Sequence, residues 1–330
     1  MRSDRHKGNR MTGRIIGTGS FLAKNRVTND DLSKIMDTSD EWIYSRTGIK
    51  ERPIAKEETT TYLATMAAKA ALADANVTPE ELDLIIVATV TNDYVTPACA
   101  CAVQAELGAM QAQAFDINAA CSGFMYSLHT VYAYMKAGLA KRALIIGAET
   151  LSRIMDWSDR STCVLFGDGA GAVVVEAAET GILACDQGAD GVRGKNLTCM
   201  NRTNNNPLVS TDTKLQYVKM DGQAVFKFAV SEVPGSINKI LEETNTKPED
   251  VKYYLLHQAN LRILQIVAKH LGISMDRFPT TMDHTGNISA ASIPILLDEV
   301  CKKGMLQRGD KIVLSGFGGG FTWGSCLMEW

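Results

Sequence analysis

The sequence predicts an α/β fold in which one structural unit is used twice. The segments VTPEELDLIIV (77–87) and TKPEDVKYYLL (246–256) each read as the end of a helix, a Pro-Glu turn and a buried strand. Pro79 aligns with Pro248, so the offset is 248 − 79 = 169 residues. The same offset carries Asn118 onto Asn287 and Gly147 onto Gly316. Two halves with this content predict two parallel sheets covered by helices.

The boundary between the halves is expected near residue 180, which gives an N-terminal half over 12–180 and a C-terminal half over 181–330. The first strand is predicted at Arg14–Thr18. No flexible linker marks the boundary, so the halves are expected to pack as one body. Two segments outside the repeat, 149–166 and the polar stretch 193–219, are candidate caps over a binding site.

Composition excludes several functional classes. Of 330 residues, 45% are hydrophobic and 22% charged, and the net charge is 34 − 37 = −3. This balance gives no general attraction to nucleic acid or to an anionic membrane. The longest apolar runs, such as Leu84–Val90, are far shorter than the roughly 20 residues of a membrane span, and the basic N-terminus has no apolar core typical of a secretory signal.

The eight cysteines form no CxxC pair, so neither a zinc motif nor a disulfide framework is predicted. Reduced thiols in a cytoplasmic protein are the simplest interpretation. No histidine lies in a cluster with ligand spacing, so no metal site is expected. Gly167–Gly171 (GDGAG) resembles a dinucleotide loop, but it precedes a strand instead of joining a strand to a helix, and that interpretation is rejected.

Cys121 is the candidate nucleophile. In AFDINAACSGF (114–124) a short strand leads to a helix that is predicted to continue to about Lys136, which places the cysteine at the turn between them. The N-terminus of a helix offers unpaired N–H groups and a partial positive charge, and both favour a thiolate. For a random cysteine, a small buried core residue would be the commoner interpretation.

The segment DINAACSGF resembles the active-site signature of β-ketoacyl-acyl carrier protein synthase III, a condensing enzyme of the thiolase superfamily. The resemblance extends from Gly13 to Trp330 and includes TSDEWIYSRTGI, FGDGAGAV, HQANLRI, TGNISAAS and GFGGGFTWGS. It implies a thiolase-like fold whose two duplicated halves form a layered α-β-α-β-α body. It also implies a homodimer, and no cofactor other than the coenzyme A thioester that serves as substrate.

The resemblance implies a catalytic triad of Cys121, His257 and Asn287. His257 directly follows a buried strand, and Asn287 opens the segment that is the repeat mate of the cysteine turn. Alone, each would be read as a structural histidine and a turn asparagine. In the family a glycine amide joins the N–H of the cysteine to form an oxyanion hole, and here the matching residue is Gly319.

Four residues match the coenzyme A contacts of the family. TSDE (38–41) has the pattern of a capping box that opens a short helix, on which Trp42 and Arg46 share one face. The resemblance implies that Trp42 and Arg46 bracket the adenine together with Arg160, and that Asn260 lies along the pantetheine arm. A simple Trp–Arg surface pair is the alternative for Trp42 and Arg46.

Three basic residues, Lys227, Arg262 and Lys269, match positions over which the family docks an acidic carrier protein. They could instead be ordinary solvated side chains. Thr96 matches a position that the family contributes across the dimer interface to the acyl pocket, where a bulky aromatic often stands. A threonine there predicts that the pocket admits primers longer or more branched than acetyl.

The expected reaction is a decarboxylative Claisen condensation of an acyl-CoA primer with malonyl-acyl carrier protein through an acyl-Cys121 intermediate, which initiates fatty acid synthesis. A degradative thiolase would carry a second cysteine where Gly316 stands, and chain-elongating synthases use a second histidine where Asn287 stands. Plant-type polyketide synthases carry a GFGPG-like loop in place of GFGGG. A polyketide- or quinolone-type synthase III relative, and a non-catalytic acyl-CoA-binding protein, remain as alternatives.

Overall fold

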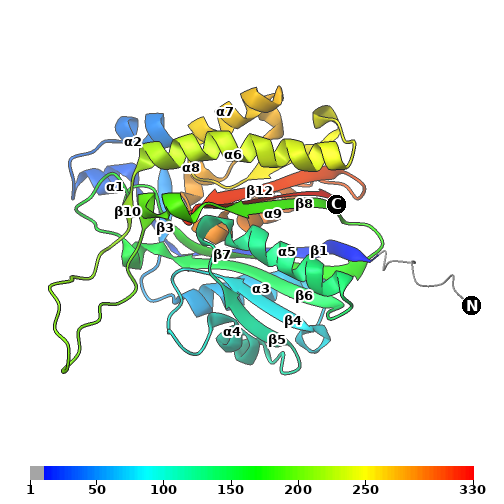
Figure 1. Cartoon of the computed structure of the whole chain (residues 1–330), viewed down its shortest axis with the longest axis horizontal. Coiled ribbons are helices and arrows are strands. Elements are labelled where there is room, and N and C mark those ends of the chain that lie inside the picture. Colours follow the sequence, from blue (N-terminus) through cyan, green and yellow to red (C-terminus); the bar gives the residue numbers. More distant parts are fainter. Residues whose placement is uncertain (1–10) are drawn as a thin grey trace, which may run out of the picture.

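The computed structural model describes residues 11–330 of the chain. Over this range the polypeptide forms five layers, in the order helices, sheet, helices, sheet, helices (Figure 1). The strands are β1 (Thr12–Leu22), β2 (Asn25–Thr28), β3 (Glu51–Ile54), β4 (Leu84–Ala88), β5 (Gln113–Ile117), β6 (Arg142–Thr150), β7 (Asp168–Ala178), β8 (Ile182–Ala189), β9 (Leu197–Thr198), β10 (Lys219–Met220), β11 (Tyr253–Leu256), β12 (Lys311–Gly318) and β13 (Thr322–Glu329).

The described residues form nine α-helices and seven short 3₁₀ helices. The α-helices are α1 (Asn29–Ser33), α2 (Asp40–Thr47), α3 (Thr60–Ala75), α4 (Cys99–Leu107), α5 (Gly123–Lys136), α6 (Gly222–Glu243), α7 (Leu261–Leu271), α8 (Met282–Thr285) and α9 (Ser292–Lys302). Short 3₁₀ helices are η1 (Pro79–Glu81), η2 (Ala120–Ser122), η3 (Leu151–Ile154), η4 (Gly191–Asn196), η5 (Pro248–Asp250), η6 (Met275–Arg277) and η7 (Ser289–Ala291).

The internal repeat is confirmed at the level of individual turns. The offset of 169 residues carries η1 onto η5 and η2 onto η7, and it aligns the starts of α5 and α9 and of β6 and β12. Even the backbone strain is repeated, because Ala120 and Ser289, which are equivalent, both have positive φ angles, 46° and 45°. The two turns therefore share one local conformation.

The two main sheets have matching strand orders. Within the described residues, one sheet runs β1-β7-β6-β4-β5 and the other runs β8-β13-β12-β11. The prediction of parallel sheets is wrong for part of each: β4 is parallel to β5 and β6, and β11 to β12, but β7, β1, β13 and β8 pair antiparallel. A short turn joins β12 to β13, and such a connection permits only antiparallel pairing.

Three apolar clusters fill the spaces between the layers. One lies between the first sheet and α3 and α4, and another between the second sheet and α6 and α7. The third surrounds α5 and α9, which lie between the two sheets (Figure 1). Strands buried on both faces account for the continuous apolar run of β4, LIIVA, in which every residue is buried. The halves thus form one body.

Two boundaries differ from expectation. The first strand extends over Thr12–Leu22, well beyond the predicted Arg14–Thr18. It can do so because Gly17 and Gly19 let the backbone of α3 lie against it: a Cβ on Gly19 would come within 2.3 Å of Ala71 N. We propose the boundary between the halves, 12–180 and 181–330, in the short connection between β7 and β8.

The second difference concerns the start of α2. The capping box predicted at 38–41 is wrong by one residue, because Ser39 is the N-cap and its side chain accepts a hydrogen bond from Trp42 N at 3.1 Å. The Thr38 hydroxyl is buried and has no hydrogen-bond partner among the described residues. The predicted helix exists, and only the identity of its cap changes.

The close contact between β6 and η7 at the centre of the molecule requires a glycine at position 147. Gly147 on β6 faces η7, and a Cβ there would lie 2.3 Å from Ala290 O and 2.8 Å from Ala291 N. Its repeat mate Gly316 has more room, because a Cβ would meet the flexible ends of Ile293 and Met125 at 3.1 and 3.2 Å. The backbone atoms beside Gly147 cannot move aside as easily as the side-chain atoms beside Gly316 can.

We therefore expect Gly147→Ala to lower the free energy of unfolding by about 1–3 kcal/mol, as overpacking of a well-packed core does. Gly316→Ala is the matched control and should cost clearly less. Urea or thermal unfolding of the two variants checks this. Equal losses, or a larger loss at Gly316, would contradict the assignment of the tight contact to Gly147.

Candidate active site

The turn that carries Cys121 is built from small residues. β5 leads through Ala119 into η2, and α5 begins two residues after the cysteine, as the sequence predicts. Ala120 adopts a left-handed conformation that costs an L-residue of order 1 kcal/mol and persists mainly where surrounding structure demands it. The Cys121 side chain is 8% exposed and lies at the N-terminal end of the central helix.

Cys121 lies between two cavities. It lines a cavity of about 230 Å³ together with His257 and Asn287, and a larger one of about 780 Å³ together with Gly319 and Ser289. Burial raises the pKa of its thiol to about 12, whereas the N-terminus of α5 acts in the opposite direction by favouring negative charge. The unliganded site therefore holds Cys121 as a thiol.

His257 follows the last residue of β11, and its backbone N–H donates to Ser315 O at 2.9 Å. The side chain is 1% exposed, and its ring meets Phe317 edge to face at a centroid distance of 5.3 Å. Burial lowers the pKa of His257 to about 3, so the ring is neutral at physiological pH. Its Nδ1 atom is buried without a hydrogen-bond partner among the described residues.

Asn287 is held at both its backbone and its side chain. Its N–H donates to Leu165 O at 2.8 Å, and its carbonyl accepts from Gly167 N at 3.0 Å. Its side-chain Oδ1 accepts from Ser289 N at 2.8 Å. Because the amide oxygen is occupied, the Nδ2 group is left to donate into the cavity that His257 and Cys121 line.

The glycine-rich turn after β12 closes against the cysteine. A Cβ on Gly318 would lie 2.7 Å from Cys121 Cβ and 2.8 Å from Cys121 N. The next residue, Gly319, lines the larger cavity beside Cys121. Only glycine at 318 lets the two backbones approach this closely.

The predicted coenzyme A contacts gather at the mouth of the smaller cavity. The guanidinium of Arg46 lies 4.6 Å from the centroid of the Trp42 ring, and that of Arg160 lies 5.1 Å from the same centroid. Arg160 also pairs with Asp37 Oδ2 at 3.1 Å. Trp42 is therefore in contact with both arginines, and the predicted shared face of Trp42 and Arg46 exists.

Asn260 has a structural role that the sequence did not indicate. It is the N-cap of α7, where its Oδ1 accepts from Arg262 N at 2.9 Å, and its Nδ2 donates to Arg46 O at 2.9 Å. Both ends of the amide are thus used to fix α7 to α2. The residue still lines the smaller cavity, so a ligand there would contact it.

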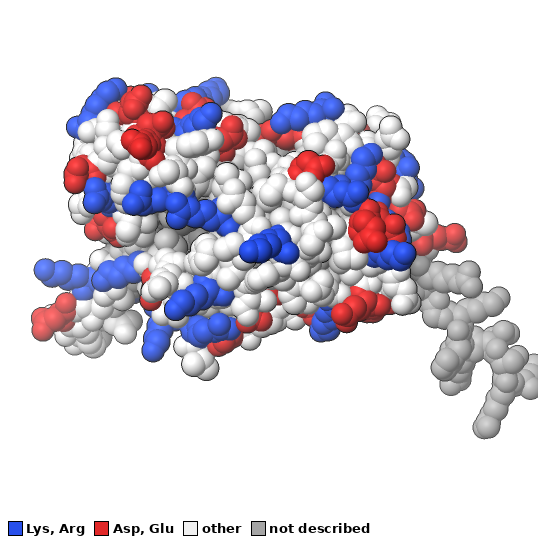
Figure 2. Space-filling model, turned by 90° about the horizontal axis from the view of Figure 1, so that it is seen from above, with Lys and Arg blue, Asp and Glu red and all other residues white. Residues whose placement is uncertain are grey.

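Lys227, Arg262 and Lys269 are exposed on α6 and α7. Figure 2 looks onto this side of the molecule and shows Lys and Arg side chains interspersed with Asp and Glu. Arg262 is not simply solvated, because its Nη2 donates to Ser45 O at 2.9 Å. Thr96 is exposed and does not line either cavity of its own chain, although its neighbour Val95 does.

The segments predicted as caps differ in placement. The segment after β6 supplies Leu151, Ile154 and Phe166 to the larger cavity. The stretch between β9 and β10 contributes Cys199, Met200 and Asn201, and then extends away from the body (Figure 1). Both segments therefore contribute to the cavity wall, the second only at its ends, and their role as caps over a binding site stays a prediction.

The sequence did not indicate the buried charged residues, of which Arg52 and Glu149 lie nearest to the site in their contacts. Arg52 is 0% exposed and donates to Asn29 Oδ1 at 2.7 Å and to Val164 O at 2.9 Å, which anchors the segment that pairs with Asn287. Glu149 is fully buried at the end of β6 and accepts from Thr91 Oγ1 at 2.5 Å and Val90 N at 3.2 Å. Burial raises the pKa of Glu149 to about 7. For Glu149, the sequence signal that could have been used is a carboxylate at the end of an apolar strand.

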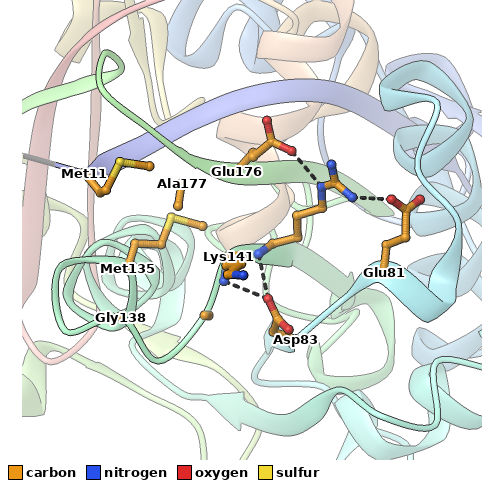
Figure 3. Close-up of a pocket in the computed structure, with 10 residues that line it drawn as sticks. Met11, Glu81, Asp83, Met135, Gly138, Lys141, Glu176 and Ala177 are labelled. Carbon is orange, nitrogen blue, oxygen red and sulfur yellow. Dashed lines mark hydrogen bonds and ion pairs between the residues drawn. The ribbon is translucent and has the colours of Figure 1, made fainter.

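Another cavity, of about 570 Å³, lies at the opposite ends of β4 and β6 (Figure 3). Its charged groups bind one another: Arg142 pairs with Glu176 at 2.7 Å and with Glu81, and Asp83 accepts from the backbone N–H groups of Lys141 and Arg142. Figure 3 draws these ion pairs and hydrogen bonds. Cys121 and His257, in contrast, follow the carboxyl ends of β5 and β11.

Comparison with known proteins agrees with this placement. The profile of the 3-oxoacyl-[acyl-carrier-protein (ACP)] synthase III family matches residues 115–191, and that of its C-terminal domain matches residues 241–330. The chain is 50% identical over 320 residues to a β-ketoacyl-[acyl-carrier-protein] synthase III of Clostridium acetobutylicum, covering 96% of this chain and 98% of the relative.

Solved structures give the same result. The 3-oxoacyl-[acyl-carrier-protein] synthase III of Aquifex aeolicus is 50% identical with a TM-score of 0.90, covering 96% of this chain and 100% of that one. The priming β-ketosynthase of the R1128 polyketide pathway is 32% identical with a TM-score of 0.91, covering 99% and 98%. The thiolase-like fold expected from the sequence is thereby confirmed. The chain belongs to the β-ketoacyl-[acyl-carrier-protein] synthase III family.

Proposed function

We propose that this protein condenses an acyl-CoA primer with malonyl-acyl carrier protein to give 3-oxoacyl-acyl carrier protein, the initiating step of fatty acid synthesis, and that Cys121, His257 and Asn287 carry the reaction. The observation that supports these roles most directly is that the three side chains, which come from both halves of the chain, line one cavity. Membership of the family makes the protein an acyl-transferring condensing enzyme.

In the first half-reaction, the sulfur of Cys121 attacks the thioester carbonyl of the primer, and the coenzyme A thiol leaves with the proton. The buried environment that raises the pKa of the Cys121 thiol also stabilises the uncharged thioester that replaces it. Backbone N–H groups of Cys121 and Gly319 are the proposed donors to the tetrahedral oxyanion. The product is the acyl-enzyme, and the departure of coenzyme A leaves the cavity open to the second substrate.

In the second half-reaction, the malonyl thioester carried by acyl carrier protein enters the cavity that Cys121, His257 and Asn287 line. His257 is neutral and so presents one ring N–H, and Asn287 presents its Nδ2 group, because its oxygen is bound to Ser289 N. Both are positioned to donate to the thioester carbonyl and to stabilise the enolate formed as carbon dioxide leaves. The enolate carbon then attacks the acyl-Cys121 carbonyl. Decarboxylation supplies the carbanion, so the chemistry requires no cofactor besides the two thioester substrates.

The remaining predicted residues are proposed to bind the two substrates outside the catalytic triad. Trp42, Arg46 and Arg160 are the proposed adenine and phosphate contacts, and binding of the adenine requires Arg160 to move away from the Trp42 ring that it now contacts. Asn260 is proposed along the pantetheine arm. Lys227, Arg262 and Lys269, which are exposed on α6 and α7, are the proposed docking residues for the acidic carrier protein.

We propose a homodimer formed along β5. This strand is the last of its sheet in the described chain and has β4 as its one neighbour, so its outer edge is open to another strand. Tyr94 and Val95, which precede Thr96, are 66% and 59% exposed. A second copy would cover them and would place Thr96 at the partner's acyl cavity.

Among residues 11–330, no helix has both the length and the apolar character needed to cross a bilayer. We propose a cytoplasmic location, where the coenzyme A and carrier-protein thioesters are available. The cysteines, all of which lie in the described part of the chain, are unpaired there, in keeping with a reducing compartment.

The two half-reactions are separable by mutation. We expect His257→Ala and Asn287→Ala to take up an acyl group from acyl-CoA but to form 3-oxoacyl-carrier product about 10²–10³ times more slowly, because each removes one donor to the enolate. Cys121→Ala should gain no acyl mass. Intact-protein mass spectrometry measures the first step and product formation the second. A wild-type protein that binds acyl-CoA without gaining covalent acyl mass would instead be a non-catalytic binder.

The neutral state of His257 predicts the pH dependence of decarboxylation. Burial lowers the pKa of His257 to about 3, so the ring stays neutral between about pH 5 and pH 8 and its donor is unchanged. Release of carbon dioxide from malonyl-acyl carrier protein by Cys121→Ala, which cannot be acylated, should be flat over this range after subtraction of the rate seen with His257→Ala. A titration near pH 6.5 would show that the ring ionises normally.

The acyl cavity predicts primer selection. With threonine at 96, we expect the enzyme to use isobutyryl-CoA or longer primers at rates comparable to acetyl-CoA, and Thr96→Phe to reduce the longer ones at least about tenfold while sparing acetyl. Rates across a primer panel measure this. Sedimentation checks the premise, since a single 35.8 kDa chain in solution would exclude a contribution from across a dimer.

A further inference from the structure

A second group of reactive side chains lies away from the proposed active site. His129 is on α5, eight residues after Cys121, whereas Cys185 is on β8 and Cys326 on β13. Antiparallel pairing places Cys185 directly opposite Cys326. All three side chains lie on the face of the second sheet that packs against α5. The cluster is not a metal site, because no group of His, Cys, Asp or Glu side chains within residues 11–330 is arranged to bind an ion.

The cross-strand pairing has the geometry that a disulfide needs. Residues directly opposite in an antiparallel sheet have Cα atoms about 4.5–5.5 Å apart, and disulfides span Cα distances of about 4.4–6.8 Å. The two thiols are also within hydrogen-bonding reach of one another. Formation of a bond between them requires no rearrangement of the strands.

A histidine side chain lies beside the pair. Its Nδ1 faces Gln187 Oε1 at 2.5 Å and its Nε2 faces Ser325 O at 3.3 Å. Both neighbours are acceptors, and only the doubly protonated ring has two N–H donors to satisfy them. The hydrogen bonds to Cys185, Gln187 and Ser325 raise the pKa of His129 despite its burial. Of the other ionisable groups around the pair, Tyr132 lies on α5 and Glu243 on α6.

Cys185 differs from the other cysteines in its environment. Hydrogen bonds from Cys326 and His129 lower the pKa of its thiol to about 6. Burial raises the pKa of Cys99, Cys121, Cys163 and Cys301. Cys185 is also partly exposed, whereas Cys326 is completely buried. One thiol of the pair is thus accessible and ionised, and the other is protected beside it.

We propose that Cys185 and Cys326 form a redox-active pair, in which a hydroperoxide oxidises Cys185 and Cys326 then closes a cross-strand disulfide. The Cys185 thiolate attacks the O–O bond, an S–O bond forms, and the hydroperoxide is reduced to water or an alcohol. Cys326 next attacks the sulfenic acid, an S–S bond forms, and hydroxide leaves as water after taking up the Cys326 proton. His129 lies where it can stabilise the thiolate. With hydrogen peroxide, two thiols and one peroxide give one disulfide and two waters.

The pair is tested on the full-length reduced protein. After treatment with hydrogen peroxide, alkylation and digestion, we expect a peptide pair joined through Cys185 and Cys326 with the loss of two hydrogens. In Cys326→Ser the same treatment should leave Cys185 as a sulfenic acid that dimedone captures. In Cys185→Ser, Cys326 should remain a free thiol. Cys101 and Cys199, which are exposed, serve as internal controls.

The role of His129 is tested by rate. Hydrogen bonds from Cys326 and then from His129 lower the pKa of the Cys185 thiol, so His129→Gln should raise that pKa in part. The loss of thiolate outweighs the gain in nucleophilicity, and oxidation of Cys185 at pH 6 should slow roughly threefold for each unit by which the pKa rises. Thermal unfolding shows whether the variant is folded. If Cys185 in the wild type is oxidised no faster than Cys101 and Cys199, or if no Cys185–Cys326 link forms, the proposal is wrong.

Discussion

The site depends on the close contact of two backbone turns that enter the central layer from opposite sheets. The cysteine turn packs against the turn before β13, where Gly318 leaves no room for a side chain beside Cys121. The repeat-mate turn packs against β6, where Gly147 meets Ala290 in the same way. Gly123 completes the contact, because a Cβ there would touch both Ala88 and Ala290. The turns that carry Cys121 and Asn287 can approach one another only because these positions lack side chains.

Burial at this contact sets the chemistry of the groups. The His257 ring is neutral because burial disfavours the charged form, and its Nδ1 atom has no hydrogen-bond partner among the described residues. Asn287 is oriented by the amide of Ser289 so that its donor is free. Neutral donors fixed in an apolar cavity suit a negative charge that appears only during the reaction, since they need not reorganise when it forms. Arg52 contributes from a distance by holding the chain that binds Asn287.

The sequence predicted those features that are encoded by repetition and by local pattern. The offset of 169 residues located the duplicated turns, and the apolar runs located β4 and β11. It did not predict the antiparallel strands, because pairing direction depends on the length of connections whose path is set by packing. It also missed the second use of Asn260, whose amide joins α2 to α7. That contact lies between segments 214 residues apart, and no local pattern encodes it. The site residues were named through family resemblance, whereas Glu149 and Arg52, which have no counterpart in a short motif, emerged only from the structure.

Cys121 and Cys185 both lie beside α5, but the pKa values of their thiols are shifted in opposite directions. Cys121 lies at the N-terminal end of α5, where the helix favours a thiolate, but burial without a charged partner keeps the thiol protonated until a substrate arrives. Cys185 lies beside the middle of the same helix, where the peptide dipole contributes little, yet hydrogen bonds from Cys326 and His129 favour the thiolate. Burial thus controls the ionisation of Cys121, whereas hydrogen bonds control that of Cys185. An enzyme that must hold an acyl thioester gains from a nucleophile that ionises only when the substrate arrives, so the thiol with the lowered pKa lies away from Cys121, where no acyl group is transferred.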